Sequence, residues 1–364
     1  MIIITFMKRW LPLLCLVLIA CNELPLGEDE LRLRGDFETE FTDLTLFSAF
    51  TESKGLNNGN ASNLVFGLNA EYESRVLLRF DFPDSTYTGL DEIKLIMNID
   101  GDYTNDTIAF SIHLMDEEFN ETEADWTHRN LDESWNTAGG DFHADSIRHG
   151  IAQGDSLVIY FNYLELAELQ AASGMIIVPR DTGFCYLDSR EGGSGGRIIL
   201  KKNETTIPII LEADCYILTG PEPSLFENWI GSGYVYRDYA KFNYDSLLDS
   251  TVAVYAEFTF RCAEYFSPLD SIEVGVRMLK EPFVTFDTPA GPLIALERIA
   301  VGDTIVTLDI VRYVQRMIEY PDSNFGFYVS INPETDFISR VKLVRGSHHL
   351  TVGYVVPPEP RTIE

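Results

Sequence analysis

The chain has 364 residues, a length at which one hydrophobic core usually stops growing, so two domains are expected. Its 45% hydrophobic and 12% aromatic residues exclude a disordered chain. The formal net charge of -30 excludes nucleic-acid readers and surfaces that bind anionic membranes, because phosphate binding requires clustered Lys and Arg.

The N-terminus has the pattern of a secretory signal peptide. Lys8 and Arg9 precede an apolar run from Trp10 to Ile19, and polar residues begin soon after it. The run is too short to span a bilayer comfortably, so a membrane helix is the less favoured alternative. Residues 1–20 are therefore expected to be a signal peptide that is removed.

The end of this segment carries a second signal. Leu18-Ile19-Ala20-Cys21 resembles the bacterial lipobox, in which signal peptidase cuts before Cys and the thiol then carries diacylglycerol. Several acyl chains, at about 0.8 kcal/mol per buried CH2, give lasting membrane attachment. We expect lipidation of Cys21 and a tether over residues 21–34. This predicts a lipid-anchored protein of the bacterial cell envelope, at the outer membrane or the cell surface.

From about Gly35 the sequence consists of short alternating segments separated by Gly, Asn, Asp and Pro. Examples are "VLLRFDF" at 76–82, "IAFSIHLM" at 108–115 and "GRIILKK" at 196–202. Short strands at regular spacing, with turn signals between them, are typical of an antiparallel sandwich or barrel.

The second half of the chain repeats the first in order. "LVFGLNAEYESRVLLRFDF" at 64–82 returns in altered form as "WIGSGYVYRDYAKFNYD" at 229–245, and a strand followed by a helical pattern occurs at both 154–172 and 302–320. The prediction is an all-β fold of two tandem jelly-roll-like antiparallel β-sandwich domains, each with one short helix. Their expected bounds are 35–203 and 204–356, followed by a tail over 357–364.

The repeated strand has two distinct faces. Phe80 and its counterpart Phe242 fall on the apolar face, so both are expected in the core at equivalent positions. Arg79 and Lys241 fall on the other face in both copies. An ion pair with a neighbouring strand explains a basic residue there, and a ligand contact through Arg79 is the alternative.

A loop at 125–142 holds two tryptophans, Trp126 and Trp135, together with Asn136. Sugar-binding proteins present flat aromatic rings because the C–H faces of pyranoses stack on them, and amides nearby bind hydroxyl groups. Trp126, Trp135 and Asn136 are therefore candidate ligand-binding residues. The alternative is that each Trp folds back over the end of the core, since it buries a large apolar area.

The first unit also resembles a known family, the DNRLRE domain, a secreted jelly-roll module with relatives among carbohydrate-binding modules. The resemblance covers about residues 36–200 and implies the same fold. The second unit, about 209–355, keeps the strands but has "KEPFVTFDTPAGPL" where the Trp loop would be. The resemblance therefore implies a ligand role for the first unit more than for the second, which could serve as a spacer or a packing partner. The residues that carry the resemblance are Asn58, Gly59, Gly67, Arg75, Leu77, Leu78, Phe80, Asp81, Trp126, Trp135, Gly139 and Gly140.

The turn "NIDGDYTNDT" at 98–107 collects oxygen ligands that suit calcium, although hairpin turns favour the same residues for backbone reasons. A structural calcium ion is the one cofactor that this pattern suggests. A plain turn is the alternative. The candidate ligands are Asp100, Asp102, Asn105 and Asp106.

No motif for a reaction occurs in the sequence. There is no nucleophile elbow, zinc-protease helix, phosphate loop or dinucleotide fingerprint. The remaining cysteines, Cys185, Cys215 and Cys262, have no zinc spacing and fit small buried hydrophobes, with one disulfide as an alternative. His348 and His349 are expected in a solvated turn.

These observations favour a non-catalytic envelope lipoprotein that binds a cell-surface or environmental polysaccharide. The alternative is a structural adhesion or assembly subunit with a protein partner. A Trp-lined groove favours sugar, whereas a broad apolar patch favours protein.

Overall fold

The computed structural model describes residues 39–83, 87–102, 107–247 and 251–356. The expected signal peptide, Cys21, the tether, Asn105, Asp106 and the tail lie outside these residues, as does the side chain of Asp102. Within them, each helix is too short or too polar to cross a membrane.

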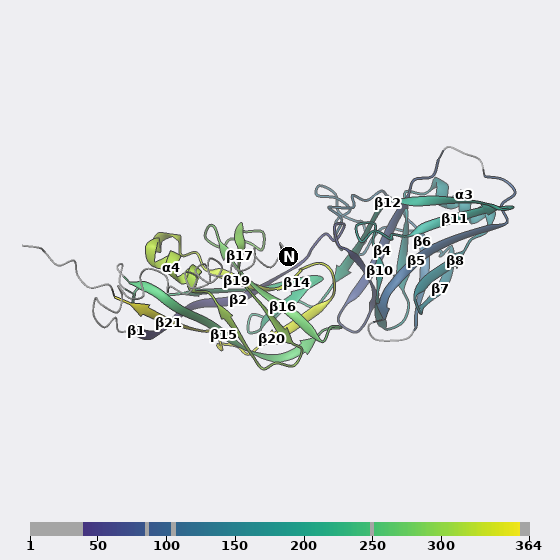
Figure 1. Cartoon of the computed structure of the whole chain (residues 1–364). Helices are drawn as coiled ribbons and strands as arrows, with labels where there is room; N and C mark the ends of the chain where they lie inside the picture. Colours follow the sequence, from purple (N-terminus) through teal and green to yellow (C-terminus); the bar gives the residue numbers. More distant parts are fainter. Residues whose placement is uncertain (1–38, 84–86, 103–106, 248–250, 357–364) are drawn as a thin grey trace, which may run out of the picture.

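The fold is all-β, with antiparallel sheets that form two sandwich units, and each unit carries one α-helix (Figure 1). This confirms the predicted fold class. The first unit consists of β3 (Asn63–Leu68), β4 (Glu73–Phe80), β5 (Glu92–Asp102), β6 (Thr107–Leu114), β7 (Arg148–Gln153), β8 (Ser156–Tyr160), α3 (Tyr163–Ala171), β9 (Met175–Pro179), β10 (Gly183–Asp188), β11 (Arg197–Lys202) and β12 (Thr205–Thr219).

The second unit has the same succession of strands around its helix. Its elements are β1 (Thr39–Leu44), β2 (Leu46–Gly55), β13 (Asn228–Ser232), β14 (Tyr234–Phe242), β15 (Val252–Phe266), β16 (Ser271–Leu279), β17 (Ala290–Ala300), β18 (Ile305–Asp309), α4 (Val311–Glu319), η1 (Pro321–Ser323), β19 (Phe327–Asn332), β20 (Ser339–Leu343) and β21 (His349–Val355).

Each unit is completed by strands that lie next to the other unit in the sequence. β1 and β2 come before the first unit in the chain, but β1 pairs with β21 and β2 pairs with β14, both in the second unit. β12 precedes the second unit, yet it pairs with β11 and β4 of the first. The two segments occupy equivalent places, because Leu46 faces Phe242 as Leu211 faces Phe80.

The sheets therefore divide the chain differently from the expected bounds of 35–203 and 204–356. Residues 39–55 belong to the second unit and residues 205–219 to the first. The reason is physical: an alternating pattern specifies that a segment is a strand and which face it buries, but it does not specify which of two similar sheets it joins.

Each unit has its own apolar core, and the repeated strand enters both at the same place. Phe80 is 8% exposed in the first core, and Phe242 is 1% exposed in the second. Their predicted burial is confirmed. The opposite face of each strand is also covered, since Leu77 packs with Trp135 and Tyr239 packs with Phe283.

The two units meet through a buried cation and aromatic rings. Arg340 of β20 is 2% exposed, and its Nη2 lies 3.0 Å from Glu71 Oε2 in the first unit. Its guanidinium also stacks on Trp229 at 4.8 Å from the ring centroid. Tyr72 and Tyr236 join their hydroxyl groups across the same junction at 3.2 Å.

Candidate functional site

The two tryptophans of the first unit cover the outer face of β4 and are held there by the protein. Trp135 is 5% exposed, and its indole N–H donates to the Asp125 carbonyl at 2.9 Å. Trp126 is half-buried, with the Arg75 guanidinium 4.8 Å from its ring centroid. Arg75 also donates to the Gly139 carbonyl at 2.7 Å. This geometry matches the lid alternative for Trp135.

The second unit builds the same cover without tryptophan. Arg237 takes the place of Arg75, and its guanidinium lies 4.1 Å from the centroid of the Phe286 ring. Arg237 also donates to the Phe286 carbonyl at 3.0 Å, as Arg75 does to Gly139. The Pro-rich passage at 280–293 is therefore the structural equivalent of the Trp loop, since a stacked Arg and ring occur in both.

Asn136 and Arg79 have partners within the protein. The Asn136 amide donates to Asp141 Oδ2 at 3.0 Å. Arg79 Nε donates to Glu212 Oε2 on the neighbouring strand β12 at 2.9 Å, and its Nη1 donates to the Phe119 carbonyl at 3.0 Å. The ion pair that the sequence favoured for Arg79 is present.

The calcium candidates are only partly described: Asp100 is exposed at the end of β5, and the other three side chains lie outside the described residues. A different acidic group occurs in the first unit, where oxygen atoms of Glu121, Glu191 and Asp214 lie within 4.8 Å of one another. Arg190 Nη2 lies 2.7 Å from Glu121 and 3.1 Å from Glu191. A guanidinium thus already supplies positive charge to this group.

Asp214 makes the first unit sensitive to pH. Burial raises the pKa of this carboxyl from 3.8 to about 7, against the opposing effect of the Arg190 backbone N–H, which donates to it at 2.9 Å. Between these two pKa values the folded chain binds more protons than the unfolded chain. The free energy of unfolding contributed by Asp214 therefore falls as pH rises from about 4 to about 7.

Asp214→Asn is expected to remove this fall in the free energy of unfolding between about pH 4 and pH 7. At pH 8 the variant should have a free energy of unfolding about 2 kcal/mol higher than the wild type, because no buried carboxylate has to ionise. Urea unfolding at pH 5 and pH 8, followed by circular dichroism, measures the difference. Equal dependence on pH in both proteins would contradict the assignment.

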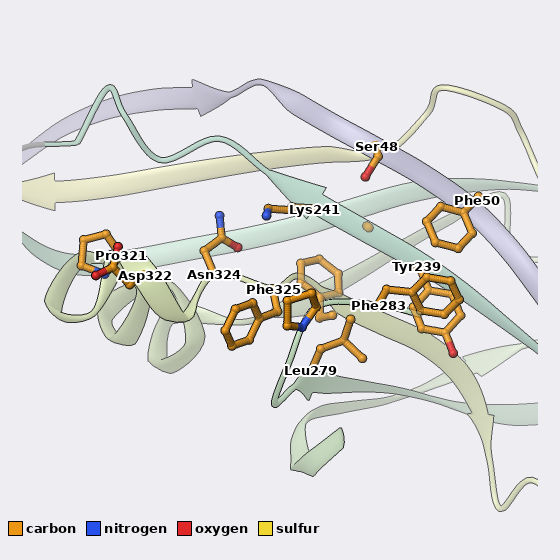
Figure 2. Close-up of a pocket in the computed structure, with 13 residues that line it drawn as sticks. Ser48, Phe50, Tyr239, Lys241, Leu279, Phe283, Pro321, Asp322, Asn324 and Phe325 are labelled. Atoms are coloured by element: carbon orange, nitrogen blue, oxygen red, sulfur yellow. The ribbon is translucent and has the colours of Figure 1, made fainter. Parts of the chain in front are cut away.

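A pocket of about 400 Å³ lies on the outer face of the second unit (Figure 2). Its side chains come from β2, β14, β19 and the end of β16, from the segment after β16, and from the turn after α4. The lining residues are Ser48, Phe50, Tyr239, Ala240, Lys241, Leu279, Pro282, Phe283, Pro321, Asp322, Asn324, Phe325 and Phe327. We call it the aromatic pocket.

The rings of the aromatic pocket support one another. Phe50 stacks on Tyr239 with centroids 5.3 Å apart and an interplanar angle of 15°, and Phe283 lies 4.4 Å from Tyr239. Tyr239 is 3% exposed, and burial raises the pKa of its hydroxyl to about 12, so it stays neutral. Phe50, Phe283 and Phe325 are half-buried and thus keep part of each ring accessible.

Alternation along β14 explains part of this site. Tyr239 and Lys241 point to the outer face, while Phe242 enters the core. The pocket itself was not predicted, because its walls come from segments far apart in the sequence. The signal that the sequence offered was a Pro close to a Phe in two separate segments. These are Pro282 with Phe283, and Pro321 with Phe325.

The expectation for His348 was wrong. His348 is 6% exposed, and its Nε2 lies 2.5 Å from Asp238 Oδ2. The Asn228 amide donates to the other oxygen of Asp238 at 2.5 Å. A buried carboxylate needs such partners, and a pair of adjacent His residues in the sequence does not reveal which one turns inward. Cys185, Cys215 and Cys262 are buried as predicted, and in the described part of the chain no disulfide joins them.

No family model matches the chain, and no curated protein matches it, so the resemblance to the DNRLRE domain stays a prediction. Among solved structures, the chain is similar to the N-terminal CBM22-1-CBM22-2 tandem domain of Xyn10C from Paenibacillus barcinonensis. The identity is 11%, the alignment covers 88% of this chain and 92% of that chain, and the TM-score is 0.19. A likeness of this size carries no argument about a ligand.

Proposed function

We propose that this protein is a non-catalytic envelope lipoprotein that binds a polysaccharide in the aromatic pocket of its second unit. The supporting observation is the set of half-buried rings, Phe50, Phe283 and Phe325, in one concave site. Polar groups of Ser48 and Lys241 lie in the same lining. Sugars need both, because their C–H faces pack on rings while their hydroxyl groups require hydrogen-bond partners.

This proposal places the site in the second unit, although the sequence favoured the first. Trp135 is enclosed and Trp126 is covered on one face by Arg75, so the Trp loop offers less accessible ring surface than its sequence implied. The aromatic pocket contains no Trp. Phe rings supply the same apolar face with a smaller area.

The envelope location is also a proposal, and it rests on the lipobox that ends at Cys21. Attachment through acyl chains leaves both sandwich units in the aqueous phase, where a polysaccharide is accessible.

A structural adhesion subunit is the second candidate. The observation that favours it is an apolar group on β1 and β15 of the second unit, where Phe41 is 64% exposed, Val254 53% and Tyr255 40%. The rings of Phe41 and Tyr255 lie 5.9 Å apart. Exposed aromatic groups of this kind also occur at protein interfaces.

The test of polysaccharide binding compares Phe325→Ala with Phe226→Ala in the soluble chain, residues 22–364. Phe325 lines the pocket, whereas Phe226 is 67% exposed and lies outside it. Loss of one stacking ring should weaken binding by about tenfold, which corresponds to about 1.4 kcal/mol. The control should bind as the wild type does. A polysaccharide array identifies the ligand, and titration calorimetry measures its affinity. Unchanged affinity in a folded Phe325→Ala variant would place the site elsewhere.

A further inference from the structure

The two units carry different residues at one pair of equivalent positions, next to the basic residues Arg79 and Lys241. Arg79 on β4 faces Ala213, and Lys241 on β14 faces Ser48, so the two basic residues are equivalent. Glu212 precedes Ala213 in the first unit, and Phe47 precedes Ser48 in the second. Each of these two residues lies in a β-bulge, and its side chain points toward the basic residue on the neighbouring strand.

The exchange of Glu for Phe changes the charge of the site. In the first unit the Glu212 carboxylate neutralises Arg79 at 2.9 Å. In the second unit Lys241 Nζ lies 5.7 Å from the centroid of the Phe47 ring instead. Within the described part of the chain no carboxylate forms an ion pair with Lys241. The ammonium group is therefore available to a ligand.

Lys241 lines the aromatic pocket itself, among the labelled side chains of Figure 2. The one other charged residue of the lining is Asp322, which is exposed. Lys241 is half-buried, and its ammonium group would gain most from an anionic partner, because charge-assisted hydrogen bonds are about twice as strong as neutral ones. The net charge of -30 opposes an anion at long range, but salt screens that repulsion beyond about 8 Å at physiological ionic strength.

We propose that the polysaccharide bound in the aromatic pocket carries acidic groups, and that Lys241 binds one of them while the Phe rings hold the sugar face. This inference rests on the proposed function and adds the charge of the ligand. The chemistry common to the candidates is an anionic oxygen on a sugar ring, either a carboxylate or a sulfate.

The experiment uses pairs of polysaccharides that share a sugar backbone and differ in whether they carry an anionic group. Polygalacturonate is compared with its methyl ester, and dextran sulfate with dextran, by calorimetry on the soluble chain, residues 22–364. The wild type should bind the acidic member of one pair at least tenfold more tightly than the neutral member. The pair that shows the preference separates carboxylate from sulfate. In 1 M salt the preference should shrink, because charges are then screened beyond about 3 Å.

Two variants test the role of Lys241. Lys241→Gln removes the charge, and Phe47→Glu installs the partner that the first unit has. Phe47 is 73% exposed, so this change should leave the fold intact. Both variants should bind acidic and neutral members within about twofold of each other. Lys202→Gln removes a charge in the first unit and should keep the wild-type preference.

The outcomes separate the two proposals. Equal binding of acidic and neutral polysaccharides by the wild type, with loss of binding in Phe325→Ala, would overturn the acidic ligand and leave the pocket function standing. An acidic preference that survives in both Lys241→Gln and Phe47→Glu would also overturn the role of Lys241. Absence of binding to every polysaccharide of the array, acidic and neutral, would overturn both proposals.

Discussion

Removal of residues 39–55 is expected to unfold the second unit and to leave the first unit folded. β2 pairs with β14 from Gly55 opposite Tyr234 to Leu46 opposite Phe242, and β1 pairs with β21 over its whole length. Without β1 and β2, the strands β21 and β14 each lose a hydrogen-bonded neighbour, and the core loses the buried Leu44. The first unit keeps all its strands, because β12 remains and pairs with both β4 and β11.

Limited proteolysis with mass spectrometry distinguishes the outcomes. The chain 56–356 should be cut throughout residues 228–355, whereas a fragment near residues 56–220 should resist the protease. A matched comparison uses two isolated fragments: 56–220 should melt cooperatively and should be more stable than 35–203, which lacks β12. Greater stability of 35–203 would mean that β1 and β2 serve the first unit, contrary to the observed strand pairing.

Cys21→Ala is expected to abolish membrane attachment. Cys21 is the one residue of the proposed lipobox that provides a thiol for the acyl chains, and several chains together supply the binding energy. Metabolic labelling with a fatty-acid analogue should mark the wild type and leave the variant unmarked. Cell fractionation should find the variant as uncleaved precursor or released protein. Absence of label in the wild type would refute the lipid anchor.

The fold class followed from the sequence because period-two alternation and turn residues act locally. Phe80 and Phe242 could be placed in two cores from the repeat alone, and both helical segments lie where the spacing put them, at Tyr163–Ala171 and Val311–Glu319. The exchange of β1–β2 with β12 could not be foreseen, because both segments satisfy the same local pattern in either sheet.

The candidate site was less accessible to sequence reasoning. Tryptophan attracted attention to the first unit, but Trp135 buries its ring and satisfies its N–H inside the protein. The aromatic pocket depends on how the segment after β16 and the turn after α4 approach β14, which is a matter of tertiary packing. The contrast between Glu212 and Phe47 also becomes visible only when the strand registers align the two bulges.

If the chain is anchored and binds its ligand as proposed, the strand exchange also sets the path along which a pulling force would travel. Thr39 lies opposite Val355, so the described chain both begins and ends in the second unit (Figure 1). Consider a pulling force applied at β1 and opposed by a polysaccharide held in the aromatic pocket. This force would be transmitted from β2 to β14 at the position where Ser48 pairs with Lys241. Under the proposed anchoring and binding, this path would bypass the first unit, although its residues lie between β2 and β14 in the sequence.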